Sequence, residues 1–167
     1  MNFERLDADP QSLVNIMAFL DPDRIKVDLL RTGAPKSLNP GLKFISTPIK
    51  LHKCKVALLR SSLVSQNEEL REFEVHRLIQ ASCHVRMDET DRRNHFNMAV
   101  SLVKECWPVP PRTTVHNLSL WQEQQAFLPH VQSLCQYYVD SCKEESPLIP
   151  SNEANWDFPK ILYEAGW

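Results

Sequence analysis

The sequence predicts a mainly α-helical fold in which a winged helix, a three-helix core with a β-hairpin as its wing, precedes further helices. Three observations lead to this fold class. Apolar residues recur at steps of three and four along most of the chain, prolines separate these stripes, and one short stretch alternates instead. In that stretch Phe73 and Val75 face one side while Glu72, Glu74 and His76 face the other, which is the period of a half-buried strand.

The three core helices lie before this stretch. The first is expected from about Pro10 to Leu20, with proline at its first position and an apolar stripe of Leu13, Ile16, Met17 and Leu20. A short second helix is expected from Lys26 to Arg31, ended by Gly33 and Pro35, and residues 33–48 then read as a long ordered loop. Pro48 opens a third helix, Ile49 to Arg60, with Leu51, Cys54, Leu58 and Leu59 facing inward.

The wing and the next helix follow directly. Strands are expected at Leu63 to Ser65 and at Glu72 to Val75, joined by a polar turn over residues 66–70. His76 stands where the wing meets a fourth helix that begins at Arg77. The apolar spacing predicts an inward face made of Leu78, Ile79, Ser82 and Cys83.

The second half of the chain predicts a helical connector. Asp88 is a suitable N-cap for a fifth helix that ends near Trp107, and a sixth runs from about Ser119 to Cys142, kinked or split at Pro129. Residues 143–155 read as a linker, and Trp156 to Trp167 as a helix that lacks an antiparallel partner and should dock weakly. The expected division is 1–88 for the winged helix, 89–150 for the connector and 151–167 for the last helix.

Composition narrows the function classes. The chain has 167 residues, 43% of them apolar, and a net charge of -2, which gives no electrostatic reason to expect nucleic acid or an anionic membrane as partner. No apolar run approaches the roughly 18 residues that span a bilayer, and polar residues follow Met1. The five cysteines form no Cys-x-x-Cys pair, so buried, reduced thiols and a cytoplasmic location are expected.

Several short motifs resemble one family when they are taken in order. The segments LLRSSLVSQN, VHRLIQ and VRMDE are similar to the winged-helix region of fungal STAND NTPases, the NOD-like receptors of NB-ARC or NACHT type. FLDPDRI at residues 19–25 and ILYEAGW at residues 161–167 resemble the opening and exit of the same region. The resemblance implies an uncharacterised domain that follows an ATPase core and precedes tetratricopeptide repeats, so residues 151–167 would begin a tetratricopeptide-like array.

The chain itself lacks the motifs of an enzyme. A P-loop needs a glycine-rich turn followed by Lys and Ser or Thr, but none of Gly33, Gly41 and Gly166 is followed by that pair. Cys83 and His84 have no partners at metal-ligand spacing. We therefore expect no catalysis, no metal and no cofactor for the isolated chain, with ADP or ATP bound only where an ATPase core is present.

His76 is the candidate nucleotide-sensing residue. The resemblance implies that Val75-His76-Arg77 corresponds to a Met-His-Asp type motif whose histidine approaches the β-phosphate of ADP, although Arg77 replaces the acidic residue. The structural alternative is that His76 only caps the helix or hydrogen-bonds the wing. Arg60 and Arg77 are candidates for contacts with the ATPase domain, and their alternative is an ordinary surface role, such as pairing of Arg60 with Glu72 or Glu74.

These features predict a non-catalytic regulatory module that couples the nucleotide state of an adjoining STAND ATPase core to a C-terminal repeat array. Its partners would be those two parts of the same protein and other proteins. A plain helical interaction scaffold is one alternative. A DNA-binding winged helix is another, with Lys50, Lys53, Lys55 and Arg60 near phosphates, but four glutamates in residues 66–74 would repel the DNA backbone.

Overall fold

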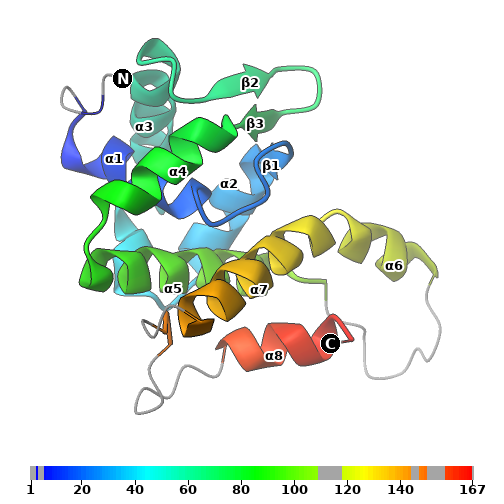
Figure 1. Cartoon of the computed structure of the whole chain (residues 1–167). Coiled ribbons are helices and arrows are strands. Elements are labelled where there is room, and N and C mark those ends of the chain that lie inside the picture. The colour runs from blue at the N-terminus through cyan, green and yellow to red at the C-terminus, as the bar shows by residue number, and fades with distance from the viewer. Residues whose placement is uncertain (1–2, 4–5, 109–117, 144–146, 150–156, 167) are drawn as a thin grey trace.

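The computed structural model describes residue 3 and residues 6–108, 118–143, 147–149 and 157–166. Within them the chain is mainly helical, with one small antiparallel sheet (Figure 1). The elements in order are α1 (Ala8–Met17), β1 (Ile25–Lys26), α2 (Val27–Lys36), the 3-10 helix η2 (Pro40–Ile45), α3 (Pro48–Arg60), β2 (Ser65–Asn67), β3 (Glu72–Glu74), α4 (Arg77–Arg86), α5 (Glu89–Cys106), α6 (Leu118–Gln125), α7 (Leu128–Lys143) and α8 (Asp157–Glu164).

The sheet has three strands in the order β1-β3-β2, and both pairings are antiparallel. Phe73 in the middle strand lies opposite Ile25 on one side and Gln66 on the other. The expected alternation in β3 is confirmed, because Phe73 and Val75 are buried and Glu74 is exposed. The first hairpin strand begins at Ser65, two residues later than expected. Leu63 and Val64 are buried in the segment before it.

The segment from residue 25 to residue 48 differs from the sequence prediction. β1 was not predicted, and the long loop expected at residues 33–48 contains instead the end of α2 and the helix η2. Gly33 does not end α2. It lies inside the helix where α2 crosses α5, and a Cβ atom there would be 2.9 Å from the Leu102 carbonyl oxygen, so the glycine permits a close approach of two helices.

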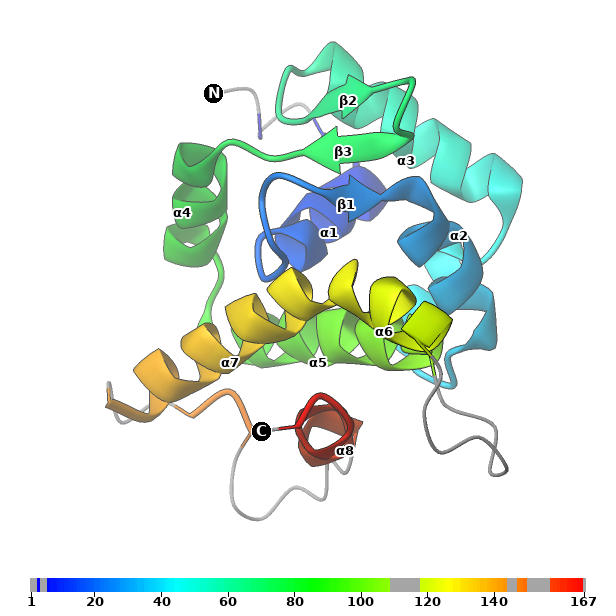
Figure 2. The ribbon, with the colours of Figure 1, turned by 90° about the vertical axis from the view of Figure 1, so that its right-hand side faces the viewer.

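The core surrounds α5, which packs most extensively on α2 and also contacts α1, α7 and α8. Figure 2 shows the sheet at one end of the molecule, α5 and α7 across the middle and α8 beyond them. Phe96, Val100 and Val103 of α5 are fully buried. The division expected at residue 88 stays a prediction, and the buried apolar residues of the two halves form one cluster.

The last two helical predictions had different outcomes. The split at Pro129 is confirmed, because α6 ends at Gln125 and α7 begins at Leu128 with Pro129 in its first turn. The final helix has packing partners, since Phe158 and Ile161 of α8 are buried against the rest of the protein, and the weakness expected of its docking stays a prediction. Most of the expected linker, as well as Trp156 and Trp167, lies outside the described residues.

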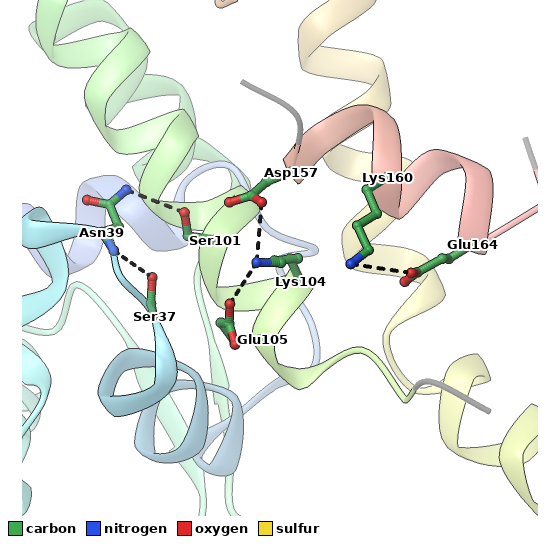
Figure 3. Close-up of polar contacts among 8 residues, drawn as sticks. All are labelled: Ser37, Asn39, Ser101, Lys104, Glu105, Asp157, Lys160 and Glu164. Atoms are coloured by element: carbon green, nitrogen blue, oxygen red, sulfur yellow. Dashed lines mark hydrogen bonds and ion pairs between the residues drawn. The ribbon is translucent and has the colours of Figure 1, made fainter. Parts of the chain in front are cut away.

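Polar contacts add to the docking of α8. Lys104 Nζ lies 2.9 Å from Glu105 Oε1 and 3.3 Å from Asp157 Oδ1 at the start of α8, as Figure 3 shows. Phe158 lies edge-on to Phe96, with ring centroids 5.4 Å apart, and 5.2 Å from Tyr138. Helix α8 therefore has partners on both α5 and α7.

The cysteines fit the expectation only in part. Cys54 and Cys83 are buried, and burial raises the pKa of their thiols to about 11 and about 12. Cys106 and Cys135 are half-buried, and Cys142 is exposed, contrary to the prediction. No described helix is long and apolar enough to cross a membrane.

Candidate functional site at the start of α4

Val75 and His76 join the end of the hairpin to α4, and His76 is the residue directly before the helix. Its backbone is extended, and its carbonyl oxygen already accepts the first helical bonds, from the N–H groups of Ile79 at 2.8 Å and Gln80 at 3.2 Å. Its side chain caps the helix, because Nδ1 accepts the N–H of Leu78 at 3.2 Å. Since a backbone N–H can only donate, Nδ1 carries no proton, and the neutral ring is protonated on Nε2.

The residues on each side hold His76 in place. The N–H of Val75 donates to the Pro22 carbonyl at 2.8 Å, and the side chain of Val75 is buried. On the other side Ile79 is buried in the first turn of α4. The imidazole itself is exposed, but the backbone that carries it is held in place on both sides.

Three consecutive side chains at this junction line three different hollows, because successive residues of a helix point about 100° apart. His76 lines a hollow of about 290 Å³ together with Glu74 and residues 59 and 62–65. Arg77 lines a groove of about 660 Å³ between α4 and α7. Leu78 lines an apolar hollow of about 580 Å³ on the outer side of α4.

The groove between α4 and α7 has a polar and well-anchored floor. Gln80 is buried, and its Nε2 donates to the carbonyls of Leu20 at 2.9 Å and Met17 at 3.3 Å, at the end of α1. His84 Nε2 lies 3.1 Å from the carbonyl of Ala18. A carbonyl can only accept, so this nitrogen is the donor. The two side chains together bind the carbonyl of Met17 at the end of α1, which also accepts the N–H of Leu20, and those of Ala18 and Leu20 just after the helix.

A buried histidine connects α7 to the loop between α1 and β1. His130 is 1% exposed, and its Nδ1 accepts the N–H of Asp21 at 3.1 Å. Burial lowers the pKa of His130 to about 4, although Asp21 and a hydrogen bond to the Arg24 backbone act in the opposite direction. Burial also lowers the pKa of His84. Both rings are therefore neutral near pH 7.

The groove is lined by a positively charged guanidinium, a carboxylate and a neutral hydroxyl that can form hydrogen bonds. Arg77 is exposed and makes no hydrogen bond or ion pair with any residue that the structure describes. Asp140 on the opposite wall already accepts from Gln136 and Lys143, and these bonds lower its pKa. Burial raises the pKa of Tyr137, which keeps its hydroxyl neutral near pH 7.

The three residues expected from the sequence are brought together in part. His76 and Arg77 stand at the same junction. Arg60 is exposed at the end of α3 and does not line the hollow of His76. In the described part of the chain Glu74 is bonded to Ser65 Oγ at 3.2 Å, and no ion pair joins Arg60 to Glu72 or Glu74.

One part of the sequence prediction for α4 is wrong. Leu78 was expected on the inward face, but it is 65% exposed, and the buried face consists of Ile79, Gln80 and Cys83. Sequence reasoning also missed the roles of Gln80, His84 and His130. The available signal was their position on or beside apolar stripes, where a polar residue needs a buried partner.

Comparison with known proteins gives one result. A family model described as a domain of unknown function, DUF7779, matches residues 1–92. No curated protein and no solved structure matches the chain.

Proposed function

Because the chain belongs to the DUF7779 family of unknown function, matched over residues 1–92, we propose its function from the site: a non-catalytic regulatory module. It would couple the nucleotide state of an adjoining STAND ATPase core to a C-terminal repeat array. Nucleotide would bind to that core, and His76 would report on it.

The order of the elements supports interpretation of the first half as a winged helix. Helices α1, α2 and α3 precede a β2–β3 hairpin, and the short strand β1 extends the sheet along the free edge of β3. The hairpin leads directly into α4 through His76. In this interpretation the hairpin is the wing, and α8 begins the repeat array.

The observation that carries the proposal is the hydrogen-bonding state of His76. Its Nδ1 is used by the helix cap, so its one remaining N–H is on Nε2 of an exposed side chain. An N–H donor to a phosphate oxygen makes a charge-assisted hydrogen bond, which is stronger than a neutral one. A donor that contacts ADP only in the closed state would shift the population toward that state.

The test uses a longer protein that carries the ATPase core, and it separates the sensor from the cap. His76→Asn keeps an oxygen that can cap α4 but removes the Nε2 donor, whereas His76→Ala removes both. If His76 contacts the diphosphate, both variants should release ADP about 10 to 150 times faster, corresponding to the roughly 1.5–3 kcal/mol of a hydrogen bond to a charged group.

His52, which is exposed on α3, provides the matched control, and His52→Ala should release ADP at the wild-type rate. ADP release could be followed with a fluorescent analogue. If His76→Asn releases ADP like the wild type while His76→Ala does not, the residue acts only as a helix cap and the sensor proposal fails.

The DNA-binding alternative has one observation in its favour, the exposure of Lys50 and Lys53 on α3. The turn of the hairpin opposes it, because Glu68 and Glu69 are exposed there. A winged helix that places this turn against a phosphate backbone would bring like charges together. Binding of the isolated chain to duplex DNA at low salt would favour this alternative over the regulatory one.

A further inference from the structure

The outer face of α4 carries an apolar strip that no described element covers. Leu78 is 65% exposed and Val85 is 86% exposed, and seven residues place them two turns apart on the same face. With Phe3, Ala81, Ser82 and Arg86 they line the hollow of about 580 Å³. Among the described residues the other large exposed apolar side chains, Leu38, Ile49, Leu70, Val139 and Tyr163, are each on a different segment.

The strip is fixed in its outward position. The opposite face of α4 buries Ile79 and Cys83, and Gln80 is bonded to two carbonyls of the α1 end, which sets the rotation of the helix. Leu78 and Val85 therefore stay exposed, because α4 could bury them only by rotating, and that rotation would break the bonds of Gln80. Arg86 closes one side of the hollow, because its guanidinium lies 4.9 Å from the centre of the buried Phe3 ring.

The charges around the strip select the kind of partner. Helix α4 carries Arg77 and Arg86 at its two ends and no acidic residue. The nearest acidic residues in the sequence are Glu74, Asp88 and Glu89. Glu74 accepts a hydrogen bond from Ser65 on the hairpin, Asp88 caps α5 and Glu89 pairs with Arg93. The surface thus combines an apolar centre with cationic ends.

We propose that this face of α4 binds an amphipathic helix of a partner protein. The apolar stripe of that helix would cover Leu78 and Val85, and its flanking acidic residues would contact Arg77 and Arg86. Laying one apolar helix face into a groove is a common mode of peptide recognition. A second copy of the chain fits less well, because antiparallel packing of two α4 helices would bring Arg77 of one copy to Arg86 of the other. A membrane would gain only two apolar side chains of a ten-residue helix.

The test uses two labelled synthetic helical peptides with leucines at helical spacing, one flanked by glutamates and one by lysines. Fluorescence anisotropy should show saturable binding of the glutamate peptide and no binding of the lysine peptide at physiological salt. The double variant L78S/V85S should weaken binding about tenfold or more, the effect of losing a buried leucine-sized contact. Leu38→Ser, at a side chain that is 97% exposed elsewhere, is the matched control and should bind like the wild type.

A charge exchange makes the test independent of folding defects. Arg77→Glu should weaken binding of the glutamate peptide and create binding of the lysine peptide, while Arg31→Glu, at an exposed position on α2, should do neither. The proposal is overturned if the glutamate peptide does not bind, or if L78S/V85S and L38S behave alike. Dimerisation of the wild type, or its binding to phosphatidylserine vesicles, would equally overturn it if L78S/V85S abolished that association.

Discussion

Acid should destabilise the protein through His130, and a single substitution should remove that effect. The ring is 1% exposed and its pKa is about 4, whereas an unfolded chain would titrate it at 6.5. Above pH 6.5 the ring is neutral in both states and its contribution to stability is complete. Between pH 6.5 and about 4 the unfolded chain binds a proton that the folded protein does not, so the free energy of unfolding falls as the pH falls.

The magnitude follows from the difference between the two pKa values. Each pH unit in this range costs about 1.4 kcal/mol, so His130 alone should account for a loss of about 3 kcal/mol. His84 acts in the same direction, because burial lowers its pKa as well. A loss of this size is a large part of the roughly 5–15 kcal/mol that stabilises a typical domain.

The variant that tests this is His130→Asn. Its side-chain oxygen can take the place of Nδ1 as acceptor for the N–H of Asp21, but it does not titrate. Urea unfolding between about pH 7 and about pH 4 should show a pH dependence that is smaller than that of the wild type by roughly 2–3 kcal/mol. His52→Asn, at an exposed histidine, should keep the wild-type dependence.

An unchanged pH dependence in His130→Asn would mean that the ring is not buried as a neutral group, and the reasoning would be wrong. The carboxylates titrate in the same range, but they are common to all three proteins and cancel in the comparison.

Four further substitutions test the packing, each by chemical denaturation. Ser62→Gly should raise the free energy of unfolding by roughly 0.5–1 kcal/mol, because Ser62 has a φ of 55° just after α3, where glycine is favoured; a loss would contradict this. Gly33→Ala should cost roughly 1–3 kcal/mol, since its Cβ would lie 2.9 Å from the Leu102 carbonyl oxygen; a neutral result would mean that the helices can separate freely. Leu58→Ala should cost roughly 2–5 kcal/mol and Leu78→Ala less than about 1 kcal/mol, because Leu58 is buried and Leu78 is not; equal losses would contradict this difference in burial.

The sequence predicts the second strand of the hairpin well, because the signal of that strand is local. Phe73 and Val75 alternate with charged residues, and this pattern alone identifies a half-buried strand. Strand β1 could not be predicted in this way, because Ile25 and Lys26 are too few to show a period. It exists because β3 offers a free edge to pair with.

The errors around α2 and α4 have a different cause. Gly33 matches the pattern of a glycine that ends a helix, but here it permits the contact of α2 with α5. No local pattern reveals a contact between residues that are far apart in sequence. In α4 the spacing of the pairs Leu78-Ile79 and Ser82-Cys83 does not decide which residue of each pair faces the core. Tertiary contacts decided the rotation, because Gln80 found buried partners on α1 and Leu78 did not.

The candidate site was predictable in position but not in chemistry. The junction at His76 follows from the change of period between the hairpin and α4. The tautomer of the ring depends on the N–H of Leu78, and the groove beside Arg77 depends on α7, which follows about 50 residues later in the chain. Neither is visible in a local pattern.

The caps at the end of α1 also affect the order in which the chain can fold. The helix α1 needs only local backbone bonds, but the carbonyls of Ala18 and Leu20 in the turn after it bind His84 and Gln80, which lie 60 or more residues later in the sequence. Contacts between such distant residues form slowly, because a long loop must be closed first. During synthesis the turn that follows α1 should therefore stay loose until α4 has left the ribosome, which makes it a candidate for chaperone contact over most of that interval.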